Sequence, residues 1–211
     1  MYIAIEGVIG VGKTSLARLL QPSYQSNLLL EIFEENPFLK GFYQDRERYA
    51  FQTQIFFLLS RYHQQHNNIP ELLKSGKNLI TDYTFDKDAL FAGVNLKGDE
   101  LDVYHSVHHA LAERIPIPDL TVYLKASTDV LLQRIALRDR AYERSMETAY
   151  IAALNETYDK FFSQVKNERN VLIVDTNTLD FVHNPPDLQF IDNRIKQCMH
   201  LAPFQAELPI D

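Results

Sequence analysis

A glycine-rich segment near the start of the chain constrains the fold more than any other feature. Residues 7–14 read GVIGVGKT and directly follow the apolar run at residues 2–5. Where a strand ends in such a turn and continues as a helix, successive backbone N–H groups point at a phosphate chain. Gly7 and Gly12 supply the unusual dihedral angles and the close approach that a side chain would block. The segment therefore predicts a loop that binds a nucleoside triphosphate.

The polar side chains that end this segment fit the same ligand. Lys13 would carry a positive charge to the outer phosphates, and the Thr14 hydroxyl would bind Mg²⁺. The helix that is expected to begin here directs the positive end of its dipole at the anion. We therefore expect ATP and Mg²⁺ as cofactors. The residues expected to bind ATP are Gly7, Gly10, Gly12, Lys13, Thr14 and Ser15.

Length and charge narrow the functional classes. The chain has 211 residues, of which 45% are hydrophobic and 23% charged, so we expect one globular domain over residues 1–211. The net charge of −7 argues against binding to a nucleic-acid backbone. No apolar run approaches the length of a membrane span and no leader precedes the first strand, so we expect a cytoplasmic protein. The lone Cys198 excludes an intramolecular disulfide and a multi-cysteine metal site.

Short apolar runs alternate with helical patterns along the chain. This alternation predicts an α/β protein with a five-stranded parallel sheet flanked by helices. A long helix is expected over about residues 46–65, followed by a second helix that Pro70 begins. Ligands of such sheets bind beyond the carboxyl ends of the strands. The runs lie at residues 2–5, 28–30, 79–80, 120–124 and 171–174.

Two carboxylates follow neighbouring strands of the predicted sheet. Asp82 ends the third run and could hold the Mg²⁺ that bridges the outer phosphates, although it could also cap the next helix. Glu31 ends the second run and could accept the proton of an attacking hydroxyl group. Because Glu34 and Glu35 follow closely, spacing alone does not choose among the three glutamates, and a solvated acidic turn is the alternative.

Four arginines fall between residues 134 and 144 of an otherwise acidic chain. Arg134 and Arg138 are four residues apart and share a helix face, whereas Arg140 and Arg144 lie in the polar stretch that follows. This cluster predicts an arginine-rich lid at about residues 138–146 that closes over the triphosphate, stabilises the transferring group and excludes water. A solvated basic face is the alternative.

The long helix carries two polar residues among apolar neighbours. Gln54 and Arg61 are seven residues apart, which is about two helical turns, so they share one face. A buried glutamine needs partners for its amide, and the edge of a nucleobase is one such partner. A backbone partner is the more common arrangement, so this signal by itself does not decide the role of Gln54.

Taken together, these residues resemble the deoxyribonucleoside kinase family over nearly the whole chain, which implies the P-loop kinase fold. The phosphate loop is similar to theirs, and residues 31–39, EIFEENPFL, are similar to the glutamate and Asn-Pro turn of the bacterial members. The resemblance implies that Glu31 is the general base for the sugar 5′-hydroxyl. It also implies that Tyr43 and Glu143 share the 3′-hydroxyl.

The resemblance implies roles for other residues too. The residues that would read the base are Gln54, Arg61 and Asp88. The lid arginines would be Arg134, Arg138 and Arg140, and with Lys13 they are the expected catalytic cations. A homodimer is implied through the helices around Phe56 and Leu101.

One position departs from the family pattern. Many relatives have an acidic residue followed by Arg and Ser at the end of the third strand, whereas this chain has Asp82, Tyr83 and Thr84. The family arginine helps to hold the general base and the phosphates, so its absence puts the rate or the geometry around Glu31 in question. Asp-Tyr is similar to the bacterial deoxyguanosine kinases and Gln54 to the deoxyadenosine kinases, which implies a purine substrate with the base left open.

The predicted reaction is transfer of the γ-phosphoryl group of ATP to the 5′-hydroxyl of a purine deoxynucleoside, giving the 5′-monophosphate in nucleotide salvage. One alternative is a nucleoside monophosphate kinase of the thymidylate type, which would need further basic groups for the acceptor's phosphate. Another is a kinase-fold subunit without catalysis. Tyr83 favours this last reading, whereas the intact Lys13, Thr14, Glu31 and Asp82 argue against it.

Overall fold

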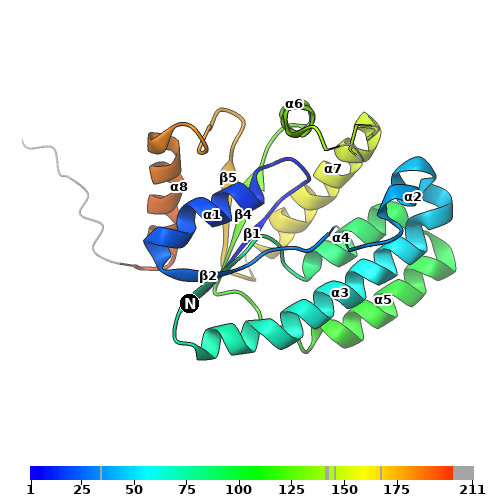
Figure 1. Ribbon diagram of the computed structural model, residues 1–211, viewed down its shortest axis with the longest axis horizontal. Helices are drawn as coiled ribbons and strands as arrows, with labels where there is room; N and C mark the ends of the chain where they lie inside the picture. The colour runs from blue at the N-terminus through cyan, green and yellow to red at the C-terminus, as the bar shows by residue number, and fades with distance from the viewer. Residues whose placement is uncertain (34, 141–142, 145, 167, 202–211) are drawn as a thin grey trace, which may run out of the picture.

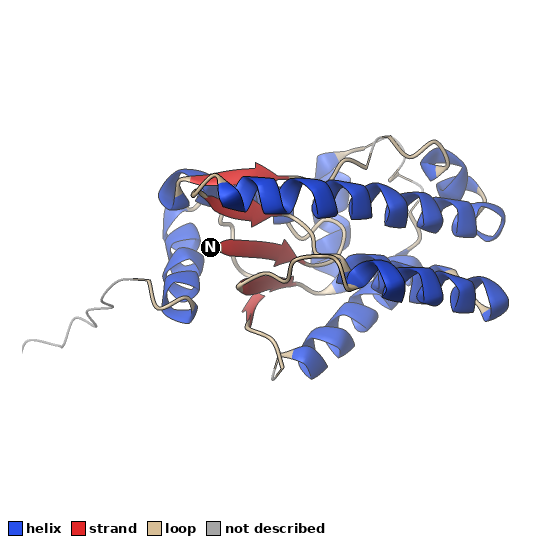
Figure 2. Ribbon diagram, turned by 90° about the horizontal axis from the view of Figure 1, so that it is seen from below, coloured by secondary structure: helices blue, strands red, loops and turns tan. Residues whose placement is uncertain are grey.

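The five apolar runs of the sequence form the strands of one parallel sheet. The computed structural model describes residues 1–33, 35–140, 143–144, 146–166 and 168–201. The strand order is β2-β3-β1-β4-β5, every neighbouring pair is parallel, and the arrowheads in Figure 2 point the same way. The strands are β1 (Tyr2–Glu6), β2 (Ser26–Leu29), β3 (Asn78–Thr81), β4 (Leu120–Lys125) and β5 (Val171–Asp175).

Helices cover both faces of this sheet, as parallel strands require. Figure 1 shows α1 and α8 on one face and α3, α4, α5 and α7 on the other. No helix within the described ranges has the length and apolar character needed to span a membrane. The helices are α1 (Lys13–Tyr24), α2 (Leu39–Gln44), α3 (Arg46–Lys74), α4 (Asp86–Asn95), α5 (Gly98–Ala112), α6 (Thr128–Arg138), α7 (Thr148–Val165) and α8 (Pro185–Cys198).

The central strand is buried on both sides. All five residues of β1 are buried, because its alternate side chains meet different helices. Tyr2 and Ala4 pack in a cluster with Ile69 of α3, whereas Ile3 and Ile5 belong to the larger core cluster that includes Leu16 of α1. This burial fixes the position of the phosphate loop, which leaves the carboxyl end of β1.

The prediction of a separate helix that begins at Pro70 was wrong. Pro70 lies inside α3, which continues to Lys74. A proline in a helix removes one backbone hydrogen bond, but burial of the adjacent Ile69 in a cluster with Tyr2 and Ala4 of β1 keeps the helix continuous through Pro70. Apolar packing therefore outweighs the local preference of proline.

The start of the phosphate loop depends on the absence of a side chain. Gly7 has φ +147, and a Cβ atom there would lie 2.5 Å from the backbone oxygen of Leu124 and 2.8 Å from Cγ1 of Val11. The loop therefore passes against β4 with no space for alanine. Gly10 and Gly12 also have positive φ angles of 87 and 105, which favour glycine at both positions.

We expect Gly7→Ala to lower the free energy of unfolding by at least about 2 kcal/mol, because the methyl group meets a backbone oxygen and the φ angle is unfavourable. Gly93→Ala is the matched control, since a Cβ at this helical glycine meets nothing within 4 Å, and it should stabilise the protein by about 0.5–1 kcal/mol. Urea denaturation measures both. A Gly7→Ala protein as stable as the wild type would contradict this account of the loop.

Candidate active site

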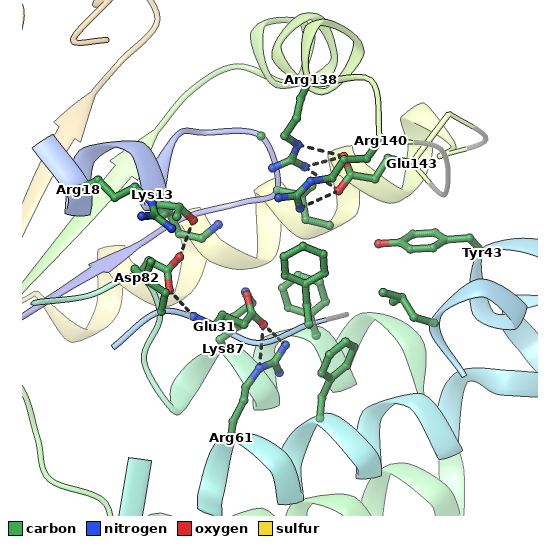
Figure 3. A pocket seen from close by; sticks show the side chains of 18 residues that line it. Lys13, Arg18, Glu31, Tyr43, Arg61, Asp82, Lys87, Arg138, Arg140 and Glu143 are labelled. Atoms are coloured by element: carbon green, nitrogen blue, oxygen red, sulfur yellow. Dashed lines mark hydrogen bonds and ion pairs between the residues drawn. The ribbon is translucent and has the colours of Figure 1, made fainter. Parts of the chain in front are cut away.

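A cavity of about 360 Å³ lies beyond the carboxyl ends of β1, β2 and β3. Figure 3 shows Lys13, Arg18 and Asp82 at one end of it, Tyr43 at the other, and the side chains of the lid region above. The predicted site residues that line the cavity are Gly10, Lys13, Thr14, Glu31, Tyr43, Arg61, Asp82, Arg138, Arg140 and Glu143. The fold therefore brings together groups that lie as far apart as residues 10 and 143.

Lys13 is held against its own loop. Its ammonium group donates to the backbone oxygens of Gly7 at 2.6 Å and Val8 at 3.1 Å. Burial, and next the positive charge of Lys87, lower the pKa of Lys13 to about 8. A bound anion would favour the charged form, so this lysine is suited to a polyphosphate.

Asp82 connects the phosphate loop to the end of β2. The Thr14 hydroxyl donates to Oδ2 of Asp82 at 2.5 Å, and the backbone N–H of Glu31 donates to Oδ1 at 2.8 Å. A hydroxyl and a carboxylate side by side fit Mg²⁺, which takes few protein oxygens and completes its shell with phosphates and water.

The Glu31 carboxylate is enclosed by two cations. Oε1 accepts hydrogen bonds from Nε and Nη2 of Arg61 at 2.9 and 2.5 Å, and Oε2 accepts one from Nζ of Lys87 at 2.5 Å. Burial by itself would raise the pKa of Glu31, but the charges of Lys87 and then Arg61 outweigh it and hold the pKa well below its usual range. The group is therefore an ionised carboxylate that can accept a proton.

Arg61 also pairs with a carboxylate behind the cavity. Its Nη1 donates to Oδ1 of Asp88, which is fully buried. Burial raises the pKa of Asp88, and Arg61 opposes this shift. Of the three residues predicted to read the base, only Arg61 is among those that line the cavity. Gln54 is buried on α3, and its Oε1 has no hydrogen-bond partner in the described parts of the chain, so base reading by Gln54 and Asp88 stays a prediction.

Two of the lid arginines meet at Glu143. Arg138, the last residue of α6, donates through Nη2 to both carboxylate oxygens of Glu143 at 2.6 Å. Arg140 lies 3.7 Å from Oε1 of the same group, and its guanidinium stacks 4.3 Å from the ring centre of Phe33. Arg144 instead pairs with the exposed Asp139. Residues 141, 142 and 145 of the predicted lid lie outside the described residues.

Arg134 lies apart from these two arginines. Its guanidinium donates to the backbone oxygens of Thr176 at 2.7 Å and Leu179 at 3.2 Å, and to that of Val11 in the phosphate loop at 3.4 Å. These bonds connect the loop to the segment after β5. Arg134 lines a second cavity, of about 610 Å³, together with Gly12 and Ser15. Its role as a lid arginine stays a prediction.

The structure adds residues to the cavity that sequence reasoning missed. Lys87 and Arg18 contribute charge, and Phe33, Phe57 and Phe91 contribute aromatic surface. Arg18 lies one helical turn after Thr14, a spacing that could have indicated it. Lys87 falls in the first turn of α4, where the helix dipole disfavours a cation. A lysine at the start of the predicted helix was therefore the sequence signal that could have indicated it.

Tyr83, which stands where the family pattern has arginine, is fully buried. Its hydroxyl donates to Oε1 of Gln64, and Nε2 of Gln64 donates to the backbone oxygen of Leu30 at 2.9 Å. Tyr83 therefore supports the backbone next to Glu31 without touching the carboxylate.

Comparison with known proteins agrees with this geometry. The sequence model of the family described as deoxynucleoside kinase matches residues 3–200. The chain is 37% identical over 199 residues to a deoxyguanosine kinase of Bacillus subtilis, covering 93% of this chain and 96% of the relative. A deoxyadenosine kinase of Dictyostelium discoideum is 31% identical, with 86% and 74% covered. The structure of a deoxyadenosine kinase from M. mycoides with bound dATP superposes with a TM-score of 0.80 and 26% identity, over 93% of this chain and 99% of that one.

We expect Arg61→Met to lower the free energy of unfolding by about 3–5 kcal/mol, because it leaves two buried carboxylates without their shared cation. The loss should shrink as the pH falls, since the raised pKa of Asp88 lets this group become neutral first. The control is Arg144→Ala, which breaks an exposed ion pair and should change stability by no measurable amount. Urea titrations at several pH values measure these differences, and an equal effect of both substitutions would contradict the pairing.

Proposed function

The chain belongs to the deoxynucleoside kinase family and is an ATP-dependent phosphotransferase, and from this premise we propose that it phosphorylates the 5′-hydroxyl of a purine deoxynucleoside. The observation that carries the proposal is the position of Glu31. Its ionised carboxylate shares the cavity with Lys13, Thr14 and Asp82, and the backbone of Glu31 is hydrogen-bonded to Asp82. A proton acceptor therefore lies beside the groups suited to a metal-bound triphosphate.

The phosphate loop and the lid would hold the donor. Lys13 and the backbone of residues 7–15 would bind the phosphates, and Thr14 with Asp82 would hold Mg²⁺, which neutralises charge on the outer phosphates when bound. Arg138 and Arg140 line the same cavity and would exchange Glu143 for the transferring phosphoryl group, stabilising its charge. We also propose that residues 1–211 form one domain with residues 138–146 as its lid.

Glu31 would act on the acceptor. An oxygen of its carboxylate would take the proton of the 5′-hydroxyl while the 5′-oxygen of the nucleoside forms a bond to the γ-phosphorus and the bond from that phosphorus to ADP breaks. The depressed pKa of Glu31 keeps the group ionised over the whole physiological pH range. Positioning of the two substrates supplies most of the remaining acceleration.

The end of the cavity at Tyr43, away from Lys13 and Asp82, would hold the nucleoside. Tyr43 and Glu143 approach it from α2 and from the lid region (Figure 3), where they could bind the sugar 3′-hydroxyl. Phe57 and Phe91 line the cavity and could stack on a base. The relatives described above are named for deoxyguanosine and deoxyadenosine, which supports a purine.

We further propose a homodimer through α3 and α5, which pack against each other. Leu59 and Val103 of these helices are 42% and 52% exposed. Apolar side chains on adjacent helices are typical of a subunit interface.

Glu31→Gln tests the proposed base. The amide cannot accept the proton, so kcat should fall by about a hundred- to ten-thousand-fold, while the Kd of MgATP should change little because Glu31 touches no group of the phosphate loop. Glu156→Gln on the exposed face of α7 serves as the control and should leave both quantities unchanged. Turnover of the Glu31→Gln protein near that of the wild type would reject the assignment.

A radiolabelled-ATP assay against the four deoxynucleosides tests the substrate. Deoxyguanosine or deoxyadenosine should give the highest kcat/KM, and the matching ribonucleoside should be at least about tenfold poorer, because its 2′-hydroxyl crowds the sugar site beside Tyr43. Deoxynucleoside monophosphates in the same assay should not be phosphorylated. Faster reaction with ribonucleosides or with monophosphates would argue against the proposed acceptor.

A further inference from the structure

Lys87 occupies a position that packing and helix formation both disfavour. It lies in the first turn of α4, at the positive end of the helix dipole, where a cation is destabilising. Its side chain is only 6% exposed, and burial of an ammonium group is costly unless it is paired. Residues that break local rules in this way concentrate at functional sites.

The partner that compensates Lys87 is the proposed base. Nζ donates to Oε2 of Glu31 at 2.5 Å and lies 5.6 Å from the ring centre of Phe91. Among the described residues Glu31 is the one side chain that forms an ion pair with Lys87. The two residues are 56 positions apart, so the contact is made by the fold and not by local geometry.

The two oxygens of Glu31 are used unequally. Oε1 accepts two N–H groups of Arg61, whereas Oε2 accepts one, from Lys87. Because each carboxylate oxygen offers about two lone-pair sites, Oε1 is filled and Oε2 keeps one site open. The oxygen that can still accept a proton is therefore the one that Lys87 holds.

Arg61 cannot take over the contact that Lys87 makes with Oε2 of Glu31. The arginine is shared with Asp88, so part of its charge is neutralised behind the cavity. Tyr83 carries no charge and is directed at Gln64. Without Lys87, Oε2 of Glu31 would have no ion-pair partner among the described residues, because Arg61 binds Oε1.

We propose that Lys87 is a positioning residue of the phosphoryl transfer, whose ammonium group orients Oε2 of Glu31 toward the acceptor hydroxyl. This inference rests on the proposed role of Glu31. Lys87 supplies, from the first turn of α4, the cation that the chain lacks at Tyr83.

Three variants test this role. Lys87→Met removes the charge, Lys87→Arg keeps it, and Lys196→Met is the control, because it removes a lysine from a pair with Asp192 on α8, on the other face of the sheet. For each we would measure thermal unfolding, kcat and the KM of the nucleoside. Loss of a merely structural lysine would not lower kcat in a protein that still folds and has an unchanged KM, and Lys87→Arg would not rescue it.

In Lys87→Met we expect kcat at neutral pH to fall by about ten- to a hundredfold, with KM within about threefold of the wild type. Lys87→Arg should restore most of kcat, and Lys196→Met should match the wild type. A kcat within about threefold of the wild type in Lys87→Met, or Arg and Met variants that behave alike, would overturn the proposal.

A double variant separates this inference from the function beneath it. If Lys87 acts through Glu31, adding Lys87→Met to Glu31→Gln should cause less than about a threefold further loss, and a full additional loss would overturn the proposal. Wild-type turnover in Glu31→Gln alone would instead reject the proposed base. Should Lys87→Met not fold, Lys87→Gln, which keeps a donor without the charge, takes its place, and a kcat within about threefold of the wild type would again overturn the proposal.

Discussion

Buried charges have to be paired, and this requirement organises the edge of the sheet where the strands end. Glu31 and Asp88 are neutralised by Arg61 and Lys87. The buried Glu6 accepts hydrogen bonds from the backbone of Gly7 and Thr84. Because removal of one partner of an ion pair leaves an uncompensated charge, the four paired residues depend on one another's positions. Their ion pairs join the end of β2 to α3 and α4 at the wall of the cavity.

The same principle explains the upper wall of the cavity. Arg138 and Arg140 are paired with Glu143, so two cations suited to a phosphoryl group are already gathered before any anion binds. Arg134 joins the phosphate loop to the segment after β5 through backbone oxygens. Buried ion pairs at Glu31 and ion pairs at Glu143 that a phosphoryl group could replace would suit a site that closes around its ligands.

Local patterns predicted much of this fold and part of the site. The phosphate loop, the five strands and the carboxylates at 31 and 82 follow from glycine spacing, β-branched runs and strand ends, which are short-range signals. The helix break at Pro70 was predicted from the same kind of signal and was wrong, because contacts of Ile69 across the sheet outweigh a local preference. Spacing also gave no means to choose among the three glutamates, and that choice came from a family resemblance.

By itself the sequence determined that the chain is an α/β protein with a phosphate loop after its first strand, because those features depend on residues that are neighbours along the chain. Only the tertiary structure decided which cations face Glu31, since Lys87 and Arg61 come from different helices, 56 and 30 residues away. It also showed that Gln54, Asp88 and Tyr83 are buried and are not among the residues that line the cavity. Charge pairing acts over distances in space and not along the chain, so these partners are known only once the helices are packed.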